Sequence, residues 1–268
     1  KLKIESAKLN KSAFIVFLKG EISKRFVNVQ LDNLDYTVHK KDIKMTLLLF
    51  NIQTILASQK AEIKYPFDKY KSENWDIEHV NSQTERKVEK ANRKEWASDI
   101  LEYYTGEAGF SNEIKGVTGE TERNIQLLKI AALDEKKARF CMRLLNILEN
   151  DKIDDDVFEK LYEELLIEFK EKDFEQNDGI SNLALLDERT NRSYGNAMFP
   201  IKRKRIIEND KNGIFVPICT KNLFLKYYSK QMGEVMYWQK NDADDYLVSM
   251  KNVLKDYLSK NKHYTSFE

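Results

Sequence analysis

The stretch Asp76-Ile77-Glu78-His79-Val80 decides the fold, together with Asn182-Leu183-Ala184-Leu185-Leu186 far downstream. Each is a short run, rich in apolar residues, of the kind that forms a β-strand. The first run starts at Trp75 and carries an acidic residue directly before a histidine. After the second run a loop holds Asn191, and residues 195–207 then form a strongly basic segment compatible with a helix. The order predicts two strands and a helix with polar residues at their junctions.

These residue types suit the hydrolysis of a phosphodiester, which needs an attacking water, a base and positive charge near the leaving oxygen. His79 could be the base because neutral imidazole exists near pH 7. Oxygen atoms of Glu78 and Asn191, completed by water, would suit Mg²⁺. Neighbouring side chains of an extended strand point to opposite sides, so Glu78 and His79 would meet only if the strand ends or bends there. Asn182 would tie the long loop after His79 to the sheet.

At these residues the chain resembles the HNH (ββα-metal) endonuclease superfamily, and most closely the C-terminal HNH domain of GmrSD-type, modification-dependent restriction proteins. That family combines an acidic-His pair after a strand with N-L-x-L-L and N-x-x-x-G-N-x-x-F-x-x-K. The third motif matches Asn191, Gly195, Asn196, Phe199 and Lys202. The start of the first motif and the spacing of the two asparagines also resemble the HNH domain of CRISPR effector nucleases.

The resemblance implies that His79 is the general base and that Asn182 holds the catalytic loop. Glu78 and Asn191 would bind Mg²⁺, or Mn²⁺ in its place, and Asp76 would support these ligands without binding the ion. The substrate would be DNA, including modified phage DNA, cut in restriction or anti-phage defence. An NTPase-type sensor domain would precede the nuclease, and no nucleotide-binding pattern is visible here. Because the chain begins at Lys1 without Met, we expect a fragment or a trimmed chain.

Two features depart from the family. His79 and Asn182 are separated by 103 positions, far more than a compact ββα unit needs. The proline often found shortly after the histidine is absent, because Asn81-Ser82-Gln83 stands there. Neither departure removes a proposed ligand.

Four basic residues follow one another in the expected helix: Lys202, Arg203, Lys204 and Arg205. On composition alone they could be a solvated helix face or a phosphate-binding surface. Beside a nuclease-like loop we expect phosphate contact. The chain as a whole has 45 basic and 44 acidic residues, so any basic surface must be local.

The remaining composition predicts a helix-rich, soluble and cytoplasmic protein, with three prolines, nine glycines and no membrane-length apolar run. Cys141 and Cys219 are expected to be buried, reduced thiols rather than zinc ligands. Asp154 to Asp156 favour a helix start over a metal site.

We predict a mainly α protein with a small α+β core: a ββα-metal motif embedded in a helical domain with a long helical insertion. The expected parts are a helical lead-in at 1–64, a nuclease core at 65–81 and 179–210, an insertion at 82–178 and a helical region at 211–268. Strands are expected at 75–80 and 180–186, and helices at 9–26, 41–58, 85–104, 124–133, 136–150, 154–174, 196–208, from 220, and at 242–258.

Two other functions stay open on the sequence. One is a DNA-binding module with a degenerate nuclease site, and the other is an RNase or toxin-type HNH nuclease.

Overall fold

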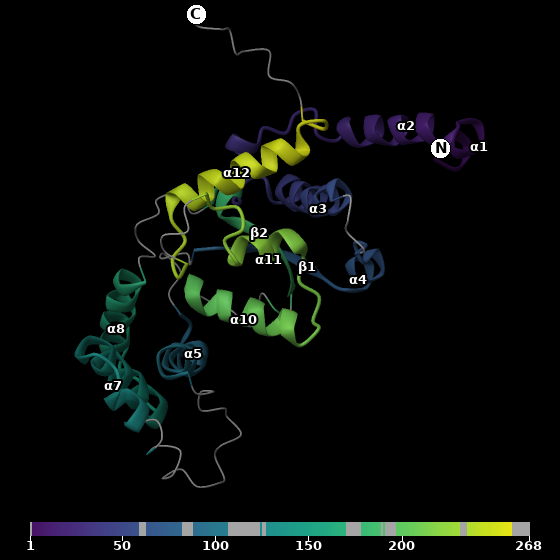
Figure 1. Ribbon diagram of the computed structural model, residues 1–268. Coiled ribbons are helices and arrows are strands. Elements are labelled where there is room, and N and C mark those ends of the chain that lie inside the picture. The colour runs from purple at the N-terminus through teal and green to yellow at the C-terminus, as the bar shows by residue number, and fades with distance from the viewer. Residues whose placement is uncertain are drawn as a thin grey trace, which may run out of the picture.

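The computed structural model describes residues 2–58, 63–81, 88–106, 124, 127–169, 178–188, 190, 197–230 and 235–258. This part of the chain is mainly helical, with one small antiparallel sheet (Figure 1). In chain order its elements are α1 (Leu2–Lys8), α2 (Lys11–Ser23), η1 (Leu31–Asn33), α3 (Lys40–Ala57), α4 (Phe67–Ser72), β1 (Trp75–His79), η2 (Lys90–Asn92), α5 (Arg93–Thr105), α7 (Glu135–Glu149), α8 (Asp155–Glu168), η4 (Ile180–Asn182), β2 (Leu183–Asp187), α10 (Phe199–Lys211), α11 (Ile218–Phe224) and α12 (Lys240–Leu254). The expectation of a mainly α protein with a small β element is confirmed.

The sheet pairs β1 with β2, although the two strands are far apart in the sequence. Trp75 lies opposite Asp187 and His79 lies opposite Leu183. Residues 183–186 of β2 are all buried. A continuous apolar run of this kind fits a strand covered on both faces.

The strands lie between two groups of helices (Figure 1). α3 packs against both strands and α11 packs against β2, while α12 packs on α3 and η4. α10 lies on the other side and contacts α11 and α5. The chain therefore places two strands and a following helix together, in the predicted order.

Helix α3 is the centre of the lead-in and begins and ends within one residue of the expected 41–58. Its apolar residues contribute Ile43, Leu47 and Phe50 to the core. The helix expected at 9–26 ends earlier, at Ser23, and Phe26 is buried beyond its end.

The described part of the insertion is helical, as expected. Helix α5 starts at Arg93 rather than at 85, and residues 82–87 lie outside the described part. α7 packs on α5, and α8 begins after Asp154, whose side chain accepts a hydrogen bond from the Val157 N–H. The helix-start interpretation of this aspartate is confirmed.

Other boundaries also differ from the prediction. β2 begins at Leu183 because 180–182 form a 3₁₀ turn, and α10 begins at Phe199, with Pro200 in its first turn. α11 begins at Ile218, so Thr220 is not its cap; the buried Thr220 hydroxyl donates to the Leu185 carbonyl oxygen at 2.6 Å. No helix within the described ranges is long and apolar enough to cross a membrane.

Candidate functional site

His79 is the last residue of β1, and its imidazole faces the lead-in and the segment before β2. Its Nε2 atom lies 3.0 Å from Oδ1 of Asp178. The ring of Tyr36 packs edge-on against it, with 4.6 Å between the ring centroids. The histidine side chain keeps 10% of its surface exposed. The proposed base is therefore held on two sides and still borders solvent.

Glu78 is buried and meets a different element. Its Oε1 atom lies 2.7 Å from Nζ of Lys202 in α10, and the same ammonium donates to the His79 main-chain oxygen at 2.6 Å. Burial raises the pKa of the Glu78 carboxyl above its ordinary value, and the nearby ammonium partly offsets the rise. The side chains of Glu78 and His79 thus have separate partners, as the alternation of a strand requires. The structure does not bring them together.

Asn182 makes the expected contact with the chain that follows His79. Its side chain is fully buried, and Oδ1 accepts a hydrogen bond from the Asn81 N–H at 3.0 Å. Its main-chain oxygen also accepts from the Val80 N–H at 2.8 Å. The residue before β2 therefore fixes the chain directly after His79, across a separation of 101 positions in the first of these bonds.

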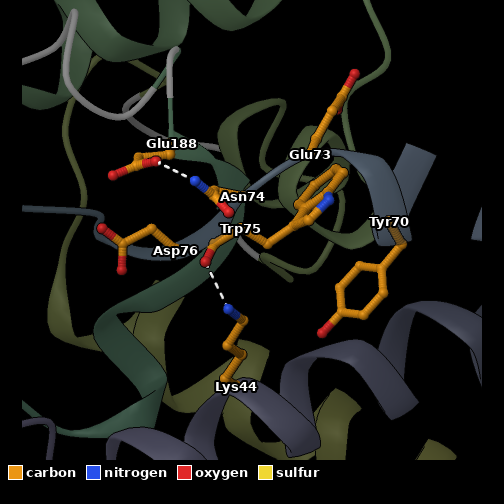
Figure 2. A pocket seen from close by; sticks show the side chains of 7 residues that line it. All are labelled: Lys44, Tyr70, Glu73, Asn74, Trp75, Asp76 and Glu188. Carbon is orange, nitrogen blue, oxygen red and sulfur yellow. Dashed lines mark hydrogen bonds between the residues drawn. The ribbon is translucent and has the colours of Figure 1, made fainter.

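Asp76 lies near the other end of β1. Its Oδ1 accepts from the Ile77 N–H at 2.8 Å, and its negative charge adds to the rise of the Glu78 pKa. This proximity is compatible with the supporting role expected of it. Figure 2 shows the side chain at a pocket of about 400 Å³ near the start of β1. The pocket is lined by Lys44, Tyr70, Glu73, Asn74, Trp75, Asp76 and Glu188.

That pocket is separate from the residues predicted to carry the chemistry, since neither His79 nor Glu78 lines it. Two of its contacts join elements that are distant in the sequence. Lys44 of α3 donates to the Trp75 carbonyl oxygen at 2.6 Å, and Asn74 donates to the Glu188 carboxylate at 2.9 Å (Figure 2). The first contact holds this end of the strand pair to α3, and the second joins the residue before β1 to the residue after β2.

A divalent metal finds only part of its expected site in the described residues. Asn191, the second expected ligand, lies outside them. No group of three or more His, Cys, Asp or Glu side chains in the described part could hold an ion. The one expected carboxylate ligand, Glu78, is already paired with the Lys202 ammonium. As placed, the described residues do not fit a divalent ion, and we derive no step through one.

The position of Lys202 contradicts the phosphate contact expected of it. It was predicted to contact phosphate from the helix surface, but its side chain is 2% exposed and points to the end of β1. Both of its named partners are oxygen atoms of that strand. In this arrangement Lys202 joins α10 to the sheet and is not accessible to a phosphate.

The other basic residues of α10 do not form an open ridge either. Lys204 is paired with Glu102 at 2.6 Å, and Arg205 is paired with Asp99. Both carboxylates belong to α5, so these two side chains hold the insertion against α10. Burial raises the pKa of Asp99, and its bond to the guanidinium partly offsets this. Arg203 is half-buried, and phosphate contact by this residue stays a prediction.

Sequence reasoning missed the contact made by Asp178. The residue lies in the turn signal Asn177-Asp178-Gly179, which gives no indication of a partner 99 positions earlier. The pairing of β1 with β2 and the bond from the Tyr36 N–H to its carbonyl oxygen bring Asp178 to His79. The predicted buried thiols are confirmed, since Cys141 and Cys219 are both buried and unpaired with each other.

Comparisons with models of protein families, with curated proteins and with solved structures return no match for this chain.

Proposed function

We propose that the chain is an HNH-type endonuclease that hydrolyses phosphodiester bonds in DNA. One observation supports this most. Two antiparallel strands and α10 converge on the Glu78-His79 pair, and Asn182 holds the loop that follows it. This is the order of elements, and the role of Asn182, that the resemblance to HNH nucleases implies.

In the proposed reaction a water molecule attacks the phosphorus while His79 takes its proton. The bond between phosphorus and the 3′ oxygen breaks, and the leaving 3′ oxygen takes a proton from solvent water. The products carry a 5′-phosphate and a 3′-hydroxyl. A general base of this kind contributes roughly 10²–10⁴-fold to a rate. His79 suits the role because its ring is held in place and yet borders solvent.

A requirement for Mg²⁺ or Mn²⁺ stays part of the proposal, on the resemblance alone. The ion would supply positive charge at the leaving oxygen. Glu78 could serve it only after exchanging the Lys202 ammonium for the ion, since that ammonium now balances its charge. Asn191 would be the second ligand.

The biological setting is proposed on the same ground. Restriction of foreign DNA, including modified phage DNA, would require a sensor domain outside this sequence. A cytoplasmic location goes with that role.

A DNA-binding module with a degenerate nuclease site is the second candidate, and the ion pair between Glu78 and Lys202 favours it. A metal ligand whose charge is already balanced inside the fold suits a structural role. An RNase or toxin-type nuclease shares the proposed site and differs in substrate.

Cleavage of supercoiled plasmid with Mg²⁺ or Mn²⁺ tests the proposal, with EDTA as the metal control. Wild type should nick the plasmid, and His79→Ala should lose at least 10²-fold in rate. His39→Ala is the matched control, because His39 lies at the start of α3 and bonds only within its own turn in the contacts described. It should cut like wild type.

Each other outcome has a meaning. Cutting that survives His79→Ala refutes the mechanism. DNA that is bound but never cut, with or without metal, indicates the binding module. A panel of RNA and of methylated or glucosylated DNA then separates the RNase from the restriction nuclease.

A further inference from the structure

The contact between His79 and Asp178 joins a histidine to a carboxylate that the sequence does not connect. The Nε2 and Oδ1 atoms are 3.0 Å apart, a normal hydrogen-bond distance. Asp178 lies outside both strands and outside every motif of the resemblance. Its side chain is one-third exposed, whereas that of His79 is nearly buried. The geometry is that of a carboxylate holding a ring from the solvent side.

The main chain around Asp178 is fixed independently of its side chain. Its carbonyl oxygen accepts from the Tyr36 N–H at 2.8 Å, and the next residue, Gly179, forms a bridge with Asp35. Gly179 in turn accepts from the Asn182 N–H at 2.9 Å. Asp178 is therefore held at a fixed place beside His79.

Tyr36 contacts both Asp178 and His79. Its main chain bonds to Asp178, and its ring packs edge-on against the imidazole. The orientation of the His79 ring is thus restricted by the Tyr36 ring on one side and by the hydrogen bond at Nε2.

We propose that Asp178 is a positioning residue that fixes both the orientation and the tautomer of His79. A carboxylate only accepts hydrogen bonds, so a neutral His79 must carry its proton on Nε2 and donate it to Asp178. The lone pair then lies on Nδ1. This inference rests on the proposed function, in which Nδ1 is the atom that takes the proton from water.

The tautomer can be read without any cleavage assay, by long-range ¹H–¹⁵N NMR of the imidazoles at one neutral pH. The chain has three histidines, and the spectrum of His79→Ala assigns the signals of His79. Wild type should show the Nε2–H form. In Asp178→Asn the amide can donate as well as accept, so the form with the proton on Nδ1 should gain population.

Activity gives the second readout. Asp178→Asn should lower kcat roughly 10–100-fold, the usual effect of removing a group that orients a functional histidine, with KM changed less than twofold. Asp178→Glu keeps a carboxylate and should recover part of kcat. Asp151→Asn is the matched control, because its side chain is 99% exposed and pairs with Lys94 of α5. It should change neither readout.

The outcomes separate the two ideas. An unchanged His79 tautomer in a folded Asp178→Asn protein overturns the inference, whatever the activity. If that variant does not fold, a wild-type spectrum in which neutral His79 carries its proton on Nδ1 refutes the inference. A wild type that shows the Nε2–H form and cuts no nucleic acid leaves the positioning role standing and refutes the proposed function.

Discussion

Replacing Lys202 by methionine should destabilise the protein far more than the same change elsewhere in α10. The ammonium is buried and lies 2.7 Å from Glu78 and 2.6 Å from the His79 carbonyl oxygen. Methionine has similar length and leaves the carboxylate buried without a counter-charge. Removing one partner of a buried ion pair costs about 3–5 kcal/mol. At this chain length that corresponds to a fall in Tm of roughly 10 °C.

The pH dependence of this loss follows from the carboxyl group. Burial already raises the pKa of folded Glu78 above its ordinary value of 4.5, and Lys202 partly offsets the rise. In the variant the offset is gone, so the folded pKa rises further. A group that binds its proton more tightly in the folded state stabilises the protein below the pKa of the unfolded state. That stabilisation is lost as pH rises through the pKa of the folded state. The deficit of Lys202→Met should therefore shrink as pH falls toward 4.5 and grow toward neutrality.

Thermal and urea unfolding followed by circular dichroism measure the effect. Lys204→Met is the matched control, since its pair with Glu102 is partly exposed at 33% and 28% and should contribute less than about 1 kcal/mol. The double variant Glu78→Met with Lys202→Met should recover at least half of the loss, because apolar side chains can replace a buried ion pair. Equal losses for the two lysines, or a double variant worse than Lys202→Met alone, would refute the reasoning.

Three further outcomes are expected. Asn182→Ala leaves the buried Asn81 N–H without its acceptor, so the free energy of unfolding should fall by about 1–3 kcal/mol in urea titrations. Asp154→Ala removes the side-chain cap of α8 and should cost about 1 kcal/mol, whereas Asp154→Asn should cost little. Burial raises the pKa of both Cys141 and Cys219 to about 12, so a thiol reagent at pH 8 should label neither until the protein unfolds; rapid labelling of the native protein would contradict their burial.

The sequence predicted the elements of the core better than their edges. The first strand was expected at 75–80 and runs from Trp75 to His79. The second was expected from Ile180, but that residue opens a 3₁₀ turn in which Asn182 directs its amide back to Asn81. The apolar side chain of Ile180 is typical of a strand. The hydrogen bond between Asn81 and Asn182 is a tertiary contact, and the residues around 180 do not reveal it.

The partners of the candidate site could not be predicted in the same way. A run of four basic residues suggests one basic surface. In the helix, however, Lys202 pairs with β1, whereas Lys204 and Arg205 pair with α5. Successive helical residues are rotated by about 100° from one another, so a continuous run cannot share one face. Which direction is buried depends on where β1 and α5 lie, and the sequence around α10 does not contain that information.

The long insertion between β1 and β2 leaves the strand pair intact because the two ends of the insertion meet. Val80 and Asn81 lie just before the insertion, and Asn182 lies just after it. The N–H groups of Val80 and Asn81 both donate hydrogen bonds to Asn182. The entropy cost of closing a loop rises only slowly with its length, by about 0.6 kcal/mol per doubling. A hundred residues between the strands therefore cost little more than fifty, provided that the closing contacts form. The main-chain oxygen and the side-chain amide of Asn182 supply those contacts, so one buried residue closes the insertion and fixes the chain after His79.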